Sequence, residues 1–240
     1  MALGIYQLYR LLRQDAFRER RWQFFLRNMQ PMDATRILDL GGYPCNWESV
    51  PILSPITFLN TEYPPGWQVN SGRFRSEIGN GCAMPFADQS FDIVYSNSVI
   101  EHVGSFEDQR RFSAEINRVG KRVFLQTPNR WFFLEPHFLA PFVHWLPWPM
   151  AKRLIQHVSL RGLMRSGDNK DLKALADELR FVRKAELRRF FPNAAIHHER
   201  WLGMTKSFIA MGPALAPSAS NEGQYRPREA SPLDEHSPAR

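Results

Sequence analysis

A glycine pair follows a short apolar run near the start of the chain, in the segment LDLGG at 38–42. An apolar run of this kind predicts a buried strand, and glycine lets the backbone turn sharply and approach a bound molecule closely. Open α/β sheets bind ligands at the carboxyl ends of their strands. Asp39, Gly41 and Gly42 are therefore the first candidates for a binding site, although any sharp turn out of a strand also uses glycine.

The segments that would position this turn alternate between strand-like and helix-like patterns. Helical spacing of apolar residues predicts a helix over 106–119 and a short one over 47–53. Strands are predicted at 36–42, 56–60, 73–78, 91–97 and 122–129. This alternation is typical of an α/β protein with a mostly parallel sheet and right-handed crossovers.

The two ends of the chain differ from this core. Arginines interleaved with apolar residues over 3–29 predict one or two amphipathic helices. After a helix predicted at 184–192, the strands at 195–202 and 205–212 are separated by Gly203, which predicts a terminal antiparallel hairpin. We therefore expect an N-terminal helical segment at 1–34, one domain at 35–212 with an insertion or lid at about 130–182, and a disordered tail at 213–240.

Composition sets outer limits on the function. The chain has 240 residues, a formal net charge of +7, and two cysteines without metal-ligand spacing. The charge suits an anionic partner such as nucleic acid, a phospholipid surface or a phosphorylated substrate, but a solvated helix face explains the same arginines. No apolar run is long enough for a membrane span. Two cysteines without metal-ligand spacing suit a reducing interior, so we expect a cytoplasmic protein with no metal site.

The segment GNGCAMPFADQSFDIVYSNSVIEHV at 79–103 carries a more specific pattern. It resembles the corresponding stretch of the methyltransferase type 11 group of class I methyltransferases, which use S-adenosylmethionine. With LDLGG upstream and the hairpin downstream, the resemblance covers roughly 35–212. It implies a Rossmann-like class I fold, a mostly parallel seven-stranded sheet with helices on both faces and a terminal antiparallel hairpin.

The resemblance also assigns cofactor-binding positions around the methionine and ribose. Asp39, Gly41 and Gly42 match the glycine-rich turn beneath the methionine part of the cofactor. Either Asn60 or Glu62 occupies the region of the ribose-binding carboxylate, which accepts hydrogen bonds from both ribose hydroxyls. Strand alignment favours Asn60, whereas charge favours Glu62.

The adenine is expected further along the same edge of the sheet. Asn80 falls where the family often has an acidic residue that contacts the adenine amino group, and its amide oxygen can also accept that bond. Gly81 and Cys82 would offer backbone groups to the adenine edge. Ser96 and Asn97 would face the cofactor from the end of the fourth strand of the family.

One departure from the family lies directly after the glycine pair. The family commonly continues with further glycines, whereas this chain has Tyr43 and Pro44. We therefore expect a differently shaped turn, which leaves the loop geometry and the cofactor affinity open.

Methyl transfer needs little covalent chemistry from the protein, because the sulfonium already activates the methyl group. The enzyme must align the acceptor with the methyl and exclude water. A hydroxyl acceptor would benefit from a general base, for which the candidates are His102, Glu135 and His137. For Glu101 and His102, capping and bracing of the following helix is the competing structural role.

The segment TPNRWFFLEPHFLAPFVHWLP at 127–147 resembles a TPNRWFPIEPH-like segment of some type 11 methyltransferases. In those proteins it contributes to the acceptor pocket or lid. Asn129, Arg130, Glu135 and His137 are accordingly acceptor-site candidates, while the aromatic residues also suit a packed insertion or a lipid interface.

The sequence thus predicts a methyltransferase with a small-molecule, lipid or glycan-intermediate acceptor and a possible peripheral membrane contact. No base-binding module is evident, so a nucleic-acid acceptor is disfavoured. The alternatives are a non-catalytic binding protein with the same fold, which the altered turn favours, and a nucleotide-dependent oxidoreductase, which the absence of G-x-G-x-x-G disfavours. The oligomeric state stays open.

Overall fold

The computed structural model describes residues 16–135, 140–141, 145–146, 150 and 179–213. The candidate His137, most of the predicted insertion and nearly all of the predicted tail lie outside the described residues. The same holds for the first half of the predicted N-terminal helical segment. Among the described helices, none combines the length and the apolar character that crossing a membrane requires.

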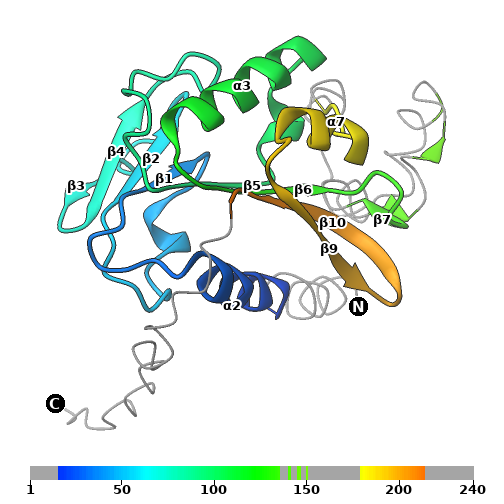
Figure 1. Ribbon diagram of the computed structural model, residues 1–240, viewed down its shortest axis with the longest axis horizontal. Helices are drawn as coiled ribbons and strands as arrows, with labels where there is room; N and C mark the ends of the chain where they lie inside the picture. Colours follow the sequence, from blue (N-terminus) through cyan, green and yellow to red (C-terminus); the bar gives the residue numbers. More distant parts are fainter. Residues whose placement is uncertain (1–15, 136–139, 142–144, 147–149, 151–178, 214–240) are drawn as a thin grey trace, which may run out of the picture.

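A twisted sheet forms the middle layer of the molecule (Figure 1). Its strand order is β3-β4-β2-β1-β5-β6-β10-β9. The strands are β1 (Ile37–Leu40), β2 (Ile56–Asn60), β3 (Asn70–Ser71), β4 (Phe74–Ile78), β5 (Ile93–Asn97), β6 (Val123–Pro128), β9 (Ala195–Trp201) and β10 (Met204–Met211). Five neighbouring strands run parallel to one another: β4, β2, β1, β5 and β6. Next to them, β10 pairs antiparallel with β6, and β9 pairs antiparallel with β10 at the edge of the sheet.

The sheet has eight strands, so the expected number of seven was wrong. The additional strand is β3, which pairs antiparallel with β4 through Asn70 and Ser71 only. Gly72 lies between them with φ +57°, a value that suits glycine and lets the chain reverse at once. Two exposed polar residues carry no apolar alternation, which explains why the sequence pattern missed this strand.

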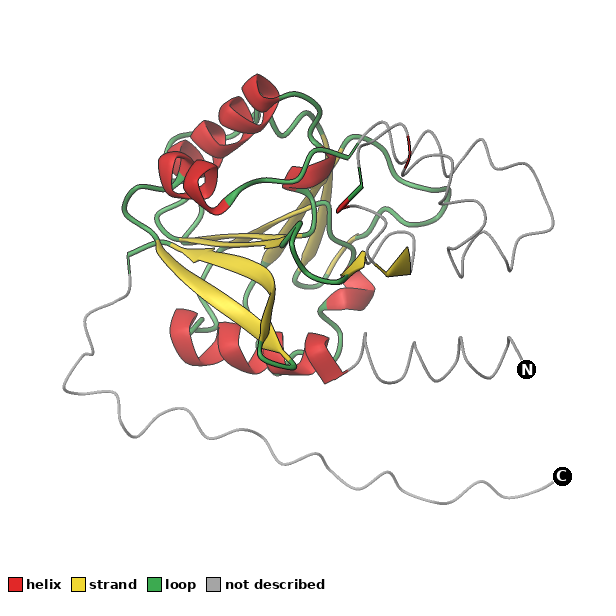
Figure 2. Cartoon of the chain, turned by 90° about the vertical axis from the view of Figure 1, so that its right-hand side faces the viewer, coloured by secondary structure: helices red, strands yellow, loops and turns green. Residues whose placement is uncertain are grey.

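Helices cover both faces of the sheet, as Figure 2 shows from the side. The helix α2 (Ala16–Met29) packs on one face, and α3 (Phe106–Val119) and α7 (Lys184–Phe190) pack on the other. Because strand side chains alternate between faces, Tyr95 of β5 points towards α2 whereas Val94 points towards α3. Tyr95 stacks on Phe124 of β6 with ring centroids 5.4 Å apart.

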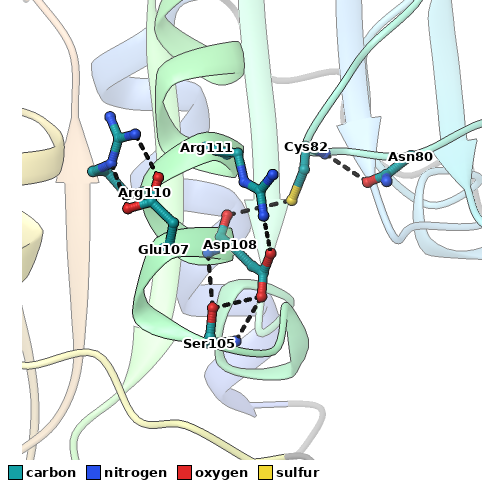
Figure 3. Close-up of polar contacts among 7 residues, drawn as sticks. All are labelled: Asn80, Cys82, Ser105, Glu107, Asp108, Arg110 and Arg111. Carbon is teal, nitrogen blue, oxygen red and sulfur yellow. Dashed lines mark hydrogen bonds and ion pairs between the residues drawn. The ribbon is translucent and has the colours of Figure 1, made fainter.

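The helix α3 begins with a capping box. Ser105 accepts a hydrogen bond from the Asp108 amide at 3.2 Å, and the Asp108 carboxylate accepts one from the Ser105 amide at 3.0 Å (Figure 3). These bonds satisfy backbone donors that the first turn of a helix leaves free. The apolar side of α3, with Phe112 and Ile116, then joins the core.

The short helix expected at 47–53 is absent. The chain after the glycine pair forms only the 3-10 helix η2 (Pro44–Asn46), followed by turns. Pro51 disfavours helical continuation, since proline lacks the amide donor and restricts the residue before it. Trp47 turns fully into the core beside α2, and this packing replaces a helix at this position.

Candidate functional site

A cavity of about 80 Å³ lies where the carboxyl ends of β1 and β5 meet α2. This is the edge at which open α/β sheets bind their ligands. Its lining combines two arginines, the glycine pair, polar side chains and aromatic rings: Arg18, Arg21, Trp22, Asp39, Leu40, Gly41, Gly42, Asn46, Tyr95 and Asn97. Asp39, the glycine pair and Asn97, all predicted from the sequence, therefore share one cavity.

The turn after β1 requires glycine at two consecutive positions. Gly41 has φ +72°, and a Cβ there would lie 2.7 Å from Val99 Cγ2. At Gly42 a Cβ would lie 1.7 Å from Asp39 Oδ2, which no side-chain adjustment of ordinary size accommodates. The missing side chains thus leave the backbone exposed to the cavity and let the Asp39 carboxyl pack directly beneath it.

Asp39 is buried below the turn, with 2% of its surface exposed. Its Oδ2 accepts a hydrogen bond from the Trp47 indole at 2.7 Å. Burial raises the pKa of Asp39 from 3.8 to about 7, and the bond from Trp47 opposes this rise. Asp39 therefore supports the turn and faces the cavity with a carboxyl group that titrates near neutral pH.

The two ribose candidates occupy different environments at the end of β2. The Asn60 side chain donates from Nδ2 to the Gly42 carbonyl at 2.9 Å, which ties β2 to the glycine turn. Glu62 is exposed and makes no hydrogen bond or ion pair within the part of the chain that the structure describes. Asn60 thus shapes the turn, while Glu62 keeps a carboxylate available at the same edge.

The adenine candidates form a loop anchored on α3, seen in Figure 3. Asn80 Oδ1 accepts from the Cys82 amide at 2.8 Å, and Cys82 Sγ donates to the Asp108 carbonyl at 3.3 Å. A Cβ on Gly81 would lie 2.6 Å from the Phe112 ring, so the loop approaches α3 closely. Partial burial raises the pKa of the Cys82 thiol, which keeps it neutral at physiological pH.

The structure separates Ser96 from Asn97. Asn97 Oδ1 accepts from Arg21 Nη1 at 2.7 Å at the cavity. Ser96 pairs in register with Leu40 and Leu125, whose side chains lie in the core on the α3 face. Its hydroxyl is buried and has no hydrogen-bond partner among the described residues. Neighbouring strand residues point to opposite faces, so only Asn97 faces the cavity.

Arg18 and Arg21 line the cavity, although the sequence pattern of α2 also suited a solvated helix face. Arg21 holds Glu199 of β9 through two bonds, at 2.7 Å and 3.3 Å, in addition to its bond to Asn97. Although burial opposes ionisation, the Arg21 guanidinium lowers the pKa of Glu199. Arg18 is exposed and makes no hydrogen bond or ion pair with any other described residue. Their spacing of three, which puts both on one helix face, was the available signal.

The Glu101–His102 pair lies in η3 (Ile100–His102), directly after β5. Glu101 is fully buried and accepts from the Thr127 hydroxyl at 3.2 Å, while its carbonyl accepts from the Arg180 amide at 2.8 Å. These contacts brace the segment against β6 and the chain before α7. His102 is exposed.

The acceptor candidates follow β6. Asn129 donates from its backbone to Lys206 at 2.9 Å and from Nδ2 to Thr205 at 2.8 Å, which fixes the segment to β10. Arg130 is exposed. Glu135 belongs to β7 (Leu134–Glu135), which pairs with β8 (Ala140–Pro141).

Comparison with known proteins gives a family match within this region. Residues 64–123 match the family model of the methyltransferase domain Methyltransf_11. The match runs from the segment before β3 through β4, β5 and α3 to the first residue of β6. No curated protein matches the sequence.

Several solved structures are similar in fold but distant in sequence. An S-adenosylmethionine-dependent methyltransferase from Mesorhizobium loti is 18% identical over 78% of this chain and 94% of its own, with a TM-score of 0.46. One from Methanosarcina mazei is 16% identical over 75% and 92%, with a TM-score of 0.41. A structure described as a putative Zn-dependent alcohol dehydrogenase from Rhodobacter sphaeroides is 13% identical over 82% and 90%, with a TM-score of 0.49.

The family match and the sheet order point to the same class of protein. The parallel strands run in the order β4-β2-β1-β5-β6, and the antiparallel β10 and β9 complete a Rossmann-like methyltransferase fold. The chain thus contains, over residues 64–123, a match to the methyltransferase domain family, within a Rossmann-like sheet.

Proposed function

We propose that this enzyme transfers the methyl group of S-adenosylmethionine directly to a small-molecule, lipid or glycan-intermediate acceptor, at the carboxyl ends of β1 and β5. The observation that carries the proposal is the cavity in which the glycine pair leaves no room for a Cβ and two arginines of α2 meet the turn. The cofactor supplies an activated methyl group. The residues of the chain bind the cofactor and the acceptor, orient them and exclude water.

The chemistry of the cavity fits the amino acid end of the cofactor. That end carries a carboxylate and an ammonium group beside the sulfonium. Arg21 is already neutralised by Glu199, whereas Arg18 has no ion pair among the described residues and lines the same cavity. We assign the cofactor carboxylate to Arg18, because a guanidinium binds carboxylates through paired donors.

The shape of the turn explains why an arginine is needed. In many α/β proteins the helix after the glycine turn offers its N-terminal amides to an anion. Here the turn continues into η2, which has three residues and begins with Pro44, a residue without an amide donor. A cation from α2 replaces those donors, and Asn60 and Asp39 hold the turn in place.

The remaining cofactor contacts extend along the same edge. Glu62 is the better ribose ligand of the two candidates, because a carboxylate can accept from both ribose hydroxyls with two oxygens, whereas Asn60 has one acceptor oxygen and its Nδ2 is bonded to Gly42. The loop at 80–82 serves the adenine through its backbone, since Asn80 Oδ1 already accepts from the Cys82 amide. We keep Asn97 as a cofactor-facing residue and assign Ser96 no contact, because it points to the α3 face.

The acceptor is expected beside the segment that follows β6. Asn129 is fixed to β10, so it positions Arg130 and the chain beyond it. His102, Glu135 and His137 remain the candidates for a general base if a hydroxyl is methylated.

Calorimetric titration with S-adenosylhomocysteine and with 5′-methylthioadenosine tests the assignment of Arg18. 5′-Methylthioadenosine lacks the amino acid end. Arg18→Ala should therefore lower the affinity for S-adenosylhomocysteine by about tenfold or more and leave the affinity for 5′-methylthioadenosine unchanged. Arg27→Ala is the matched control, because Arg27 lies on α2 and outside the cavity. Equal affinities of Arg18→Ala and Arg27→Ala for S-adenosylhomocysteine would refute the assignment.

A further inference from the structure

Three large apolar side chains are exposed near one end of the sheet. Trp131, directly beyond β6, is 65% exposed, and Leu202 and Met204 at the tip of the β9–β10 hairpin are 74% and 38% exposed. Single exposed apolar residues are common on soluble proteins, whereas a group of them marks a contact surface. We call these three residues the apolar tip.

Hydrogen bonds and ring contacts hold the two segments of the apolar tip together. Asn129 bonds to Thr205 and Lys206, and its Oδ1 accepts from the Trp131 amide at 3.1 Å. The ring of Phe132 lies 5.9 Å from that of Trp201, the residue before Leu202. Figure 1 shows the hairpin reaching the end of the molecule at which β7 begins. The segment at 129–132 therefore lies beside the β9–β10 hairpin, and the apolar tip draws on two distant parts of the sequence.

The conformation of Leu202 indicates that folding does not explain its presence. Leu202 has φ +48° and Gly203 has φ +79°, so both central residues of the hairpin turn are left-handed. Such turns favour asparagine, aspartate or glycine, and a bulky side chain is strained there. Leu202 accepts this strain while remaining mostly exposed, and a local conflict of this kind is typical of a functional surface.

The charges next to the apolar tip are positive. Arg130 lies beside Trp131, with its guanidinium carbon 5.9 Å from the ring centroid, and Arg200 is exposed two residues before Leu202. The neighbouring Glu199 is turned inwards to Arg21 and Ser207, with only 12% of its side chain exposed. Tryptophan and leucine bordered by arginines form the composition that binds at the interface of an anionic bilayer.

We propose that the apolar tip docks on a membrane of anionic phospholipids, with Trp131 and Leu202 in the interface and Arg130 and Arg200 at the headgroup phosphates. A symmetric contact with a second copy would bring the arginines of both copies together, which disfavours that occupant. Docking places the segment after β6 at the bilayer. Among the proposed acceptors, docking at a bilayer favours a lipid or lipid-linked compound. This choice of acceptor rests on the proposed function, whereas the docking itself is independent of it.

Sedimentation of the full chain with vesicles tests the docking. Vesicles of phosphatidylglycerol and phosphatidylcholine in equal parts should bind the chain, and pure phosphatidylcholine should bind it at least about tenfold more weakly. Leu202→Asn and Trp131→Ala should each lower the partition coefficient by about tenfold. Asparagine suits a left-handed turn, so Leu202→Asn should fold at least as well as the parent chain.

The matched control is Leu53→Asn, which removes a leucine that is 59% exposed and far from the hairpin in sequence. The proposal is overturned if the anionic vesicles bind no chain, or if Leu202→Asn and Leu53→Asn bind equally well. A concentration-dependent doubling of mass that Leu202→Asn abolishes would assign the tip to a second copy and also overturn it. S-adenosylhomocysteine titration of the parent chain keeps the two proposals separate: absent cofactor binding together with intact vesicle binding contradicts the proposed function alone.

Discussion

Two neighbouring regions of the cofactor edge are built in opposite ways. At two places in the loop–helix region, residues 79–119, the bonds are local: Asn80 holds the Cys82 amide in the loop, and Ser105 exchanges bonds with Asp108 at the start of α3. In the glycine-turn region, residues 39–47, the partners are distant in sequence: Asn60 holds Gly42, and Arg21 of α2 holds Asn97 beside the turn. The first region lies within the family match at 64–123, and the second lies outside it.

The difference shows how long-range packing can support a turn that its own local bonds do not hold. The glycine turn lacks the helix that would follow it, and its support comes from the core under α2, where Trp47 packs against Trp22 with ring centroids 4.6 Å apart. The turn at Asn80–Cys82 and the cap of α3 need no such help, because they satisfy their own backbone groups. Substitutions in the turn should therefore cost more than substitutions in the local caps.

The largest effect is expected for Gly42→Ala. The added Cβ would meet Asp39 Oδ2 at 1.7 Å, so the turn or the buried carboxyl must move. We expect a loss of about 4 kcal/mol in the free energy of unfolding, measured by urea denaturation. Gly66→Ala is the control, because Gly66 also has a positive φ, +81°, but a Cβ there meets nothing within 4 Å. Its free energy of unfolding should fall by only about 1 kcal/mol. Equal losses for both variants would contradict the packing argument.

Asp39→Asn should change how stability depends on pH. The folded pKa of Asp39 is about 7 instead of 3.8, so between these values the folded chain holds a proton that the unfolded chain has released. The contribution of Asp39 is fully present below the unfolded pKa and falls by up to about 4 kcal/mol as pH rises through the folded pKa. Asparagine still accepts the bond from Trp47 but does not titrate.

Urea denaturation of both chains at about pH 4.5 and about pH 8 measures this difference. The stability of Asp39→Asn relative to the parent chain should increase towards the higher pH, whatever the other groups contribute to both chains. If the two chains lose or gain stability in parallel over this range, Asp39 does not titrate as its burial implies.

Ser105→Ala should have the smallest effect of the three. It removes the side-chain acceptor of the capping box of α3 and should cost about 1 kcal/mol in the free energy of unfolding. Because the cap lies away from the cavity lining, affinity for S-adenosylhomocysteine should be unchanged. A loss as large as that of Gly42→Ala would show that the local region is not self-supporting.

The sequence predicted the elements whose signals are local. The helix predicted at 106–119 is α3 (Phe106–Val119), and the hairpin around Gly203 is present as β9 and β10. The prediction of a helix at 47–53 was wrong because Pro51 and the burial of Trp47 override the apolar spacing. Competition between spacing and packing cannot be read from a single segment.

The candidate site was predictable in its backbone but less so in its charges. The glycine pair is recognisable in the sequence, because few other residues permit such a turn. The contact between Arg21 and Glu199 joins residues 178 positions apart, so no local pattern reveals it. Without that contact the arginines of α2 resemble any solvated helix face, and Arg18 could not be distinguished from Arg27.

Calorimetric titration of the parent chain, Gly42→Ala and Gly66→Ala with S-adenosylhomocysteine, with NAD as the control ligand, tests the central claim most directly. We expect saturable binding to the parent chain and to Gly66→Ala, affinity reduced by about a hundredfold in Gly42→Ala, and no binding of NAD. Equal binding by the two glycine variants would place the cofactor elsewhere, and absence of binding to the parent chain at millimolar ligand would contradict the account.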